Sequence, residues 1–351
     1  MSRVLALAQK LAETHTLSDG ELLALLEGRC EASAALLRTA AQKAACAVFG
    51  RRIYLRGLIE FTNYCRNDCY YCGIRRSNQK ASRYRLTPDQ ILACCESGYR
   101  LGFRTFVLQG GEDPWWTDRR LEALVSAVRA RFPDCALTLS VGERSPESYR
   151  ALFRAGADRY LLRHETADPA HYALLHPPSL SPARRMACLR ELKAIGYQVG
   201  AGMMVGSPGQ TPEHLVRDLR FLQEFRPHMV GIGPFLSHPD TPFRAEPDGS
   251  AQLTLYLLSI VRLLLPLALL PATTALGTAL PGGRELGILH GANVVMPNLT
   301  PSGVRGKYLL YHDKLSTGAE SAAGLPLLRS SLAAIGYEIA GGRGDSPMQP
   351  N

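Results

Sequence analysis

Three cysteines in the first quarter of the chain have a spacing that suits metal binding. Cys65, Cys69 and Cys72 lie in YCRNDCYYCGIRR as a CxxxCxxC array. Soft thiolates favour iron–sulfur clusters or zinc. A structural zinc needs a fourth ligand, and the residues that follow, 73–76, include no Cys or His. Three thiolates would leave one iron of a 4Fe–4S cluster open to a further molecule. The alternatives are a zinc site completed by a distant residue and three unrelated buried cysteines.

The elements around this array predict where it lies. Short apolar segments, each followed by a turn and an amphipathic stretch, recur from residue 51 onwards, and Pro after Ser or Thr marks helix starts at Thr87, Ser145, Ser181 and Thr211. Eight strands are expected, at 54–61, 105–109, 136–141, 159–163, 198–205, 229–234, 269–275 and 292–296. Strands that alternate with helices favour parallel pairing through right-handed crossovers.

Eight such units predict an α/β fold, a complete (β/α)8 TIM barrel, with a doubly wound sheet as the alternative. Residues 1–48 have a helical pattern and form an N-terminal extension, 49–340 the barrel, and 341–351 a Gly/Pro-rich flexible tail. In such a barrel, reactive groups lie on loops at the carboxyl ends of the strands. The cysteines follow the first strand, and Arg163-His164-Glu165 ends the fourth, where charges are costly unless they are paired.

Composition sets the class of protein. Nine cysteines, an odd number in 351 residues, argue against a disulfide framework. The start has no signal-peptide pattern, and the most apolar window, 253–272, holds Arg262 and two prolines, which argues against a membrane span. A net charge of +9 favours solubility and is compatible with acidic partners, but no interleaved basic and aromatic motif indicates nucleic acid. We expect a cytoplasmic protein with reduced thiols, bound neither to membrane nor to nucleic acid.

The cysteine array resembles the signature of the radical S-adenosylmethionine (SAM) superfamily. The resemblance implies that Cys65, Cys69 and Cys72 hold one 4Fe–4S cluster whose open iron binds SAM, which is cleaved to methionine and a 5′-deoxyadenosyl radical. It also assigns a set of SAM contacts from the loops that follow the strands: Tyr71, Gly110, Gly111, Glu112, Ser140, Glu165 and Arg185. Packing for Tyr71, turn chemistry for Ser140 and a solvated helix charge for Arg185 are the ordinary alternatives.

Further motifs are similar to one family within that superfamily, the FeFe-hydrogenase maturases HydE. They include VLQGGEDP, GADRYLLRHETA, GAGMMVGSPGQT, PATTALGT and GANVVMPNLTPS, and the match runs from about residue 50 to 312. It implies a set of substrate contacts inside the barrel: Gln109, Arg163, Thr273, Thr274, Met296, Tyr308 and Tyr311. Arg163 with two threonine hydroxyls would suit an anion, although β-propensity, core filling and helix packing are alternative reasons for the threonines, Met296 and the tyrosines.

What this resemblance implies for function is assembly of the hydrogenase H-cluster. The enzyme would remodel an iron–cysteine–CO–CN synthon, a small anionic organometallic substrate. It would make transient contacts with the maturases HydG and HydF and with an electron donor. Some HydE proteins carry cysteines near the C-terminus for an accessory iron–sulfur cluster, but YHDKLSTGAESAAGLPLL has none, so we expect no such cluster. A HydE-like enzyme for an amino acid or thiazolidine, and a non-catalytic iron–sulfur carrier, are the competing hypotheses.

Overall fold

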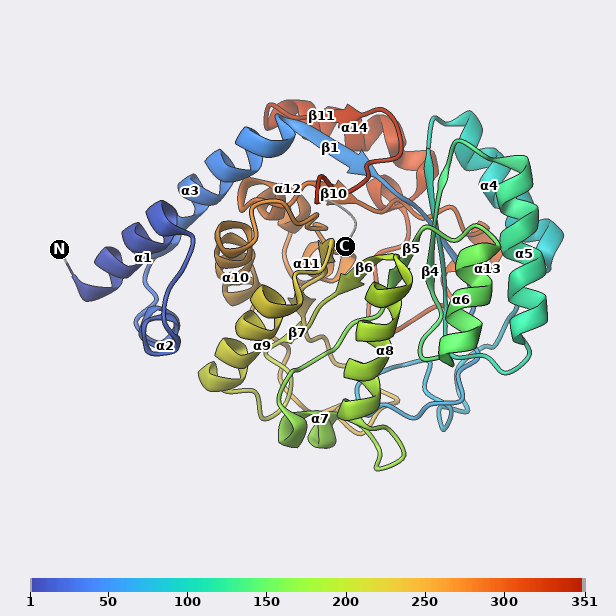
Figure 1. Cartoon of the computed structure of the whole chain (residues 1–351), viewed down its shortest axis with the longest axis horizontal. Helices are drawn as coiled ribbons and strands as arrows, with labels where there is room; N and C mark the ends of the chain where they lie inside the picture. The colour runs from blue at the N-terminus through green and yellow to red at the C-terminus, as the bar shows by residue number, and fades with distance from the viewer. Residues whose placement is uncertain (1, 349–351) are drawn as a thin grey trace.

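A computed structural model describes residues 2–348, which begin with three helices, α1 (Arg3–Thr14), α2 (Asp19–Glu27) and α3 (Glu31–Phe49). Ser18 caps α2, since its side chain accepts from Glu21 N at 3.3 Å. In Figure 1 these helices form an arm at one side of the molecule, and α3 returns to pack against α10 (Ala251–Leu264). The predicted helical extension is confirmed.

The barrel is built from parallel strands. One sheet has the order β2 (Gly57–Thr62), β3 (Thr105–Gly110), β4 (Ala136–Ser140), β5 (Arg159–Leu161), β6 (Gln198–Ala201) and β8 (Met229–Val230). Single parallel bridges continue this order from Met229 to Leu269, from Pro271 to Val294 and from Asn298 back to Leu58. The eight predicted segments therefore form one ring, and the predicted α/β barrel is confirmed.

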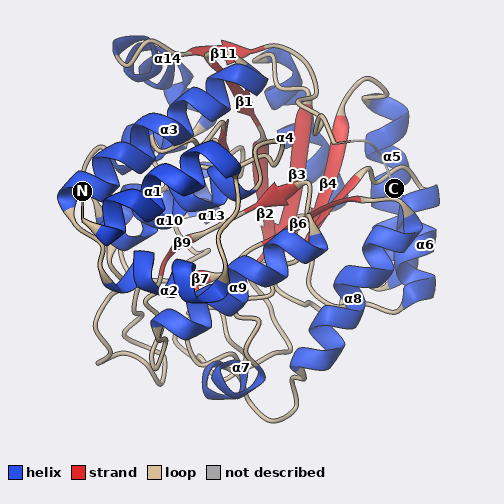
Figure 2. Cartoon of the chain, turned by 60° about the vertical axis from the view of Figure 1, so that its left-hand side comes forward, coloured by secondary structure: helices blue, strands red, loops and turns tan. Residues whose placement is uncertain are grey.

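Helices cover the outside of the strands (Figure 2). They are α4 (Pro88–Arg100), α5 (Asp118–Arg131), α6 (Pro146–Arg154), α7 (Pro169–Leu175), α8 (Pro182–Ile195), α9 (Pro212–Phe225), α10, α11 (Thr274–Ala279), α12 (Gly283–Leu289), α13 (Ser302–Arg305) and α14 (Leu325–Ala334). The predicted Ser/Thr-Pro starts open α4, α6, α8 and α9. At α9 His214 Nδ1 also accepts from Thr211 N at 3.0 Å.

Four of the expected strands differ in detail from the structure. The first is divided at Arg56 into β1 (Arg52–Leu55) and β2, and β1 pairs with β10 (Val294–Val295) and β11 (Glu338–Ala340). The strands expected at 198–205 and 229–234 are interrupted before β7 (Met204–Val205) and β9 (Gly233–Pro234), which pair with each other. The segment 269–275 makes only bridges before α11 begins, because Thr273 caps that helix.

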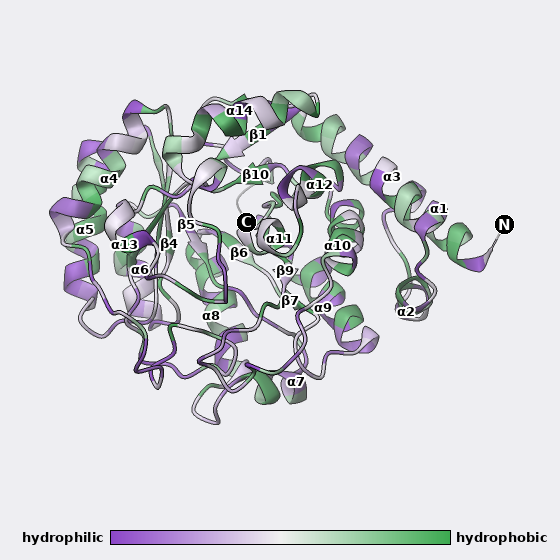
Figure 3. Cartoon of the chain, turned by 180° about the vertical axis from the view of Figure 1, so that it is seen from behind, coloured by the Kyte–Doolittle hydropathy of each residue, from purple (hydrophilic) through white to green (hydrophobic). Residues whose placement is uncertain are grey.

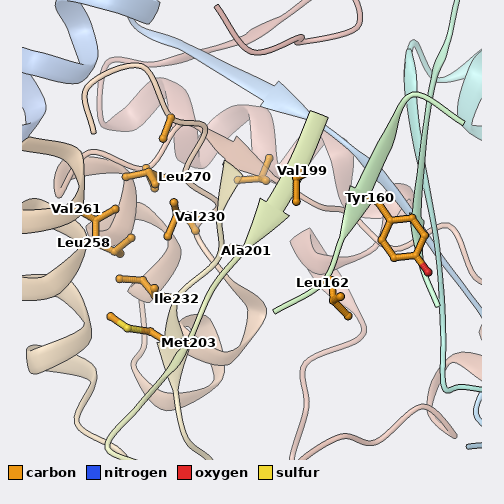
Figure 4. Close-up of a cluster of buried hydrophobic side chains, with 14 of the residues drawn as sticks. Tyr160, Leu162, Val199, Ala201, Met203, Val230, Ile232, Leu258, Val261 and Leu270 are labelled. Atoms are coloured by element: carbon orange, nitrogen blue, oxygen red, sulfur yellow. The ribbon is translucent and has the colours of Figure 1, made fainter. Parts of the chain in front are cut away.

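The hydrophobic core lies between the strands and the outer helices. Figure 4 shows part of it, with buried side chains in or next to β5, β6, β8 and α10: Tyr160, Leu162, Val199, Ala201, Met203, Val230, Ile232, Leu258, Val261 and Leu270. Figure 3 shows the strongly hydrophobic colouring of α10, all of whose residues from Thr254 to Leu264 are buried. Within residues 2–348, no helix combines the length and the apolar character needed to cross a membrane.

The residues that follow β11 contact the barrel at the amino ends of its strands. Arg159 Nη2 donates to Asp345 Oδ1 at 2.6 Å and to Arg343 O at 2.9 Å, and Arg343 also pairs with Asp158. The described part of the predicted tail, up to Met348, is therefore anchored by ion pairs. The division of the chain at residues 48 and 340 stays a prediction.

Candidate active site

The three cysteines lie on the long segment between β2 and α4, which contains no helix or strand. Its backbone is held by three other parts of the barrel. Arg66 N donates to Glu112 O at 2.9 Å, Tyr70 N to Leu175 O at 3.0 Å and Gly73 N to Leu310 O at 2.8 Å. Because these partners lie after β3, at the end of α7 and after α13, the cysteine loop is fixed at the carboxyl end of the barrel.

A half-buried arginine, Arg83, organises the inside of this loop. Arg83 donates to the carbonyl oxygens of Ile74 at 2.8 Å, Arg75 at 2.6 Å and Asn78 at 3.1 Å. Arg75 in turn pairs with Asp68 at 2.8 Å. One guanidinium thus satisfies carbonyl groups that have no partner in a regular element. No spacing rule in the sequence indicated this role for Arg83.

The thiols of the loop are close enough to affect one another. Burial raises the pKa of Cys69 to about 12, with a further contribution from the Cys65 thiol. Burial also raises the pKa of Cys65, and raises that of Cys72 well above its usual value. The metal-free thiols are therefore protonated, and a metal that binds them must displace protons.

The donor set fits a cluster better than a single ion. Among residues 2–348 no three His, Cys, Asp or Glu side chains are grouped as one metal ion requires. Cysteine ligands of a 4Fe–4S cluster bind different irons, so their sulfurs do not need to meet at one point. A loop with three neighbouring thiols at a barrel mouth therefore suits such a cluster.

The two glycines at the end of β3 allow this loop to approach the strand. A Cβ on Gly111 would lie 2.3 Å from Tyr64 O and 2.8 Å from Cys65 Cβ, and one on Gly110 would lie 2.7 Å from Thr62 Cγ2. Since backbone and Cβ atoms cannot move aside cheaply, a larger residue at 111 would displace the cysteine loop.

Glu112 links the cysteine loop to the loop after β4. Its Oε1 accepts from Glu143 N at 2.8 Å and its Oε2 accepts from Arg66 Nε at 3.0 Å. Ser140, at the end of β4, is half-buried and lies in register with Gln109 of β3. The predicted SAM contacts from β3 and β4 are thus adjacent, and Glu112 already has two protein partners.

The residues after β5 carry polar atoms that protein partners leave unsatisfied. Glu165 has a positive φ of 66° and is 8% exposed. Its Oε2 lies 3.2 Å from Arg163 Nη2, but the two atoms are not aligned for a hydrogen bond, and both of them, with Arg163 Nε, remain unpartnered. Buried polar atoms of this kind are costly without a partner. A ligand with ammonium, carboxylate and hydroxyl groups, as SAM has, would satisfy them.

Arg185 lies on α8 and joins two of these loops. Its Nε donates to Glu143 Oε1 at 2.6 Å and its Nη1 to Arg163 O at 2.6 Å. Burial opposes its charge, but Tyr172, Glu143 and Tyr71 outweigh this and raise the pKa of Arg185. The sequence did not single out Glu143, which lies in an irregular loop without a motif.

Tyr71 is held by aromatic neighbours. Its hydroxyl lies 3.2 Å from His176 Nε2, and the two rings meet edge to face at 5.4 Å. His176 also stacks on Tyr172 at 3.9 Å. Burial lowers the pKa of His176 to about 3, so the ring is neutral at pH 7. Tyr71 therefore has a fixed orientation beside the cysteines.

The predicted substrate contacts come from several sides of the barrel. Thr273 Oγ1 accepts from Leu276 N at 3.4 Å as the cap of α11, and Thr274 Oγ1 donates to Glu320 Oε2 at 3.1 Å. Both hydroxyls thus have protein partners, and neither forms a hydrogen bond with Arg163. Met296 packs against a small apolar cluster.

Tyr308 and Tyr311 lie on the segment after α13. Tyr308 is 2% exposed. Burial raises the pKa of both tyrosines, and Glu60 raises both further. The two phenols are therefore protonated at pH 7.

Sequence reasoning missed a buried ion pair near these tyrosines. Glu60 of β2 is fully buried, and its Oε1 accepts from Lys314 Nζ at 2.5 Å while its Oε2 accepts from Asn298 Nδ2 at 2.8 Å. A carboxylate within the apolar segment 54–61 was the available signal, since an acid is rarely buried without a partner. The pair holds the segment after α13 to the barrel.

Comparisons with known proteins agree with this geometry. A model of the family described as "Radical SAM superfamily" matches residues 59–222. The chain is 46% identical over 287 residues to the [FeFe] hydrogenase maturase subunit HydE of Thermotoga maritima. The aligned region covers 82% of this chain and 82% of the relative. It is 30% identical to a 3-methylornithine synthase of Methanosarcina barkeri over 84% of this chain and 83% of the relative. Among solved structures, methylornithine synthase has a TM-score of 0.81 at 27% identity and covers 95% of this chain and 97% of its own.

Proposed function

Because the chain belongs to the HydE family of FeFe-hydrogenase maturase subunits, within the radical SAM superfamily, we propose that it cleaves SAM reductively during assembly of the hydrogenase H-cluster. The observation that carries this proposal is the CxxxCxxC loop, fixed at the barrel mouth beside buried polar atoms that have no protein partner. A non-catalytic iron–sulfur carrier would not need those atoms.

The proposed ligands of one 4Fe–4S cluster are Cys65, Cys69 and Cys72. When bound, the reduced cluster supplies the electron that divides SAM into methionine and a 5′-deoxyadenosyl radical. The proposed SAM contacts are Tyr71, Gly110, Gly111, Glu112, Ser140, Glu165 and Arg185. Glu165 would accept from the ammonium group or a ribose hydroxyl, and the glycines would allow close backbone approach.

In this proposal Arg185 and Glu112 have a further role. Each is bound to protein through two polar contacts, so they hold the loops after β3, β4 and β5 in place whether or not they also contact SAM. Pre-organised contacts of this kind orient reactants and exclude water.

We propose an iron–cysteine–CO–CN synthon as the substrate, bound by Gln109, Arg163, Thr273, Thr274, Met296, Tyr308 and Tyr311. Arg163 supplies a cation with two unpartnered nitrogens, which suits an anionic cyanide complex. The proposed partners are HydG as the source of the synthon, HydF as the acceptor and a separate electron donor, all in the cytoplasm.

The absence of an accessory cluster is part of this proposal. It rests on the lack of cysteine beyond Cys188. After anaerobic reconstitution, we expect about four irons per chain, as one 4Fe–4S cluster contains. A content near eight irons per chain would contradict it.

A second candidate is an enzyme for a small organic substrate, and the similarity to methylornithine synthase over almost the whole chain favours it. The two are distinguished by supplying the anaerobically reconstituted protein with SAM, a reductant and the HydG product. We expect 5′-deoxyadenosine to form and the iron complex to be consumed. Formation of 5′-deoxyadenosine without consumption of the complex would favour the second candidate, and no 5′-deoxyadenosine at all would contradict both.

A further inference from the structure

We propose that His164 and Asp218 are positioning residues, which hold the left-handed turn at Glu165 and thereby set the affinity for SAM. This inference rests on the proposed function. Both side chains are fully buried, and neither belongs to the proposed SAM or substrate contacts.

His164 connects the end of β5 to the end of β6. Its Nδ1 accepts from Gly202 N at 3.2 Å. An accepting ring nitrogen carries no proton, so the neutral ring has its proton on Nε2. That nitrogen faces Asp218 Oδ1 at 3.2 Å, although off the direction of a full hydrogen bond. The ring also packs on Phe221 at 4.6 Å.

Asp218 extends this connection to the residues on the other side of Glu165. It lies on α9, and its Oδ1 accepts from Ala167 N at 2.5 Å. The buried pair therefore holds the chain on both sides of Glu165. His164 directly precedes it, and Ala167, which bonds to Asp218, follows it by two residues.

The turn itself needs such support. Glu165 is one of four residues other than glycine with a positive φ among residues 2–348. Side chains other than glycine, asparagine and aspartate rarely adopt this conformation, and they keep it where the surroundings enforce it. Glu165 N donates to Gly202 O at 3.0 Å, so Gly202 contacts both the turn and the His164 ring. Loss of the His164 ring would free Gly202 and, with it, the turn at Glu165.

Release of the turn would change the direction of the Glu165 carboxylate, whose Oε2 has no hydrogen-bond partner in the protein. Small displacements of binding groups have large effects on reactive complexes. The side chains of His164 and Asp218 bond to Gly202 N and Ala167 N and not to the proposed SAM contacts, so they act through the backbone on either side of Glu165.

The test uses His164→Leu, with His164→Asn as the conservative variant, because the Asn oxygen is able to accept from Gly202 N. The matched control is His228→Leu. His228 is also buried, and its Nδ1 accepts from Val199 N at 3.1 Å, so it makes the same kind of bond near the opposite end of β6. Binding of SAM to the cluster-loaded chains is measured by equilibrium dialysis, together with iron content, Tm and formation of 5′-deoxyadenosine.

We expect His164→Leu to raise the Kd for SAM about tenfold, with iron content unchanged and kcat at saturating SAM within about twofold. His164→Asn should recover most of the affinity, Asp218→Asn should lose part of it, and His228→Leu should lower Tm without a change in Kd. A crystal structure of His164→Leu should show Glu165 outside the left-handed region.

The inference is overturned if His164→Leu binds SAM as tightly as the natural chain, or if His228→Leu weakens SAM binding equally. If the natural chain binds SAM but forms no 5′-deoxyadenosine, the proposed activity fails while the positioning role stands. A natural chain that binds no SAM would overturn both.

Discussion

The two ends of the barrel both bury arginine side chains, but they support the charges differently. At the carboxyl end, Tyr172, Glu143 and Tyr71 surround Arg185 and raise its pKa despite its burial. At the amino end, burial lowers the pKa of Arg56 and Arg159, both 2% exposed. Arg159 gains Asp345 as a partner, whereas Arg56 Nε and Nη2 have none.

This difference separates two tasks. The loops of the carboxyl end hold one another in place around the proposed SAM site through charged side chains. At the amino end, the segment that follows β11 supplies Asp345, whose carboxylate pairs with the buried Arg159. Changes at the first end should therefore act on SAM and the cluster, and changes at the second should act on stability alone.

The largest expected effect tests the first half of this comparison. Cys69→Ala should lose the cluster and reduce formation of 5′-deoxyadenosine to that of a protein-free sample, because two cysteines cannot replace three ligands. Iron content, visible absorption and product analysis measure the result. Cys188→Ala is the control, since Cys188 is buried on α8 and should not change iron content. Retained cleavage in Cys69→Ala would refute the assignment of this cysteine.

Arg185→Lys should have the next largest effect. Lysine keeps the charge but lacks the planar group that reaches Glu143 and Arg163 O together. We expect the Kd for SAM to rise about tenfold and the free energy of unfolding to fall by about 2 kcal/mol, since one buried partner loses its hydrogen bond. Dialysis and urea unfolding measure the two quantities. Normal SAM affinity would mean that the two ends of the barrel are less different than proposed.

Asp345→Asn tests the amino end of the barrel, where we expect an effect on stability and not on SAM binding. Although burial opposes it, Arg159 and Arg343 hold the pKa of Asp345 at about 2. A carboxylate with a lowered folded pKa adds stability above its unfolded pKa, and this contribution is lost as the pH falls through the folded value. Because the Asp345 side chain is 41% exposed, we expect Asp345→Asn to lower the free energy of unfolding by about 1 kcal/mol at pH 7. The difference in the free energy of unfolding between this variant and the natural chain should shrink as the pH falls from about 4 to about 2.

Urea unfolding at several pH values measures that difference. SAM affinity is the control in the same variant and should not change. A change in SAM affinity would show that the amino end communicates with the mouth of the barrel.

The ring of strands and the starts of the helices were predictable because they depend on local patterns. Alternating apolar segments defined the strands, and Ser/Thr-Pro pairs defined α4, α6, α8 and α9. The division of the first strand at Arg56 was not predictable, because β1 pairs with β10 and β11, which come from the far end of the sequence.

The residues of the site that belong to a local sequence motif were predictable. Those that act through contacts between distant loops were not. The cysteine spacing and Gly110-Gly111 are local. Glu143, Lys314 and Asp218 have no local signal, since each acts through a partner 42, 254 or 51 residues away. Thr273 reads as a strand residue by propensity but caps α11, because the chain turns there.

The anchoring of the segment after β11 has a practical consequence for handling the protein. Residues 343–345 are attached at the amino ends of the strands, opposite the cysteine loop. A solid support coupled through a C-terminal linker would therefore orient each molecule with its mouth facing the solution. Immobilised in this way, the protein would stay open to a soluble reductant, whereas a shortened chain that lacks Asp345 would be a poor choice for attachment.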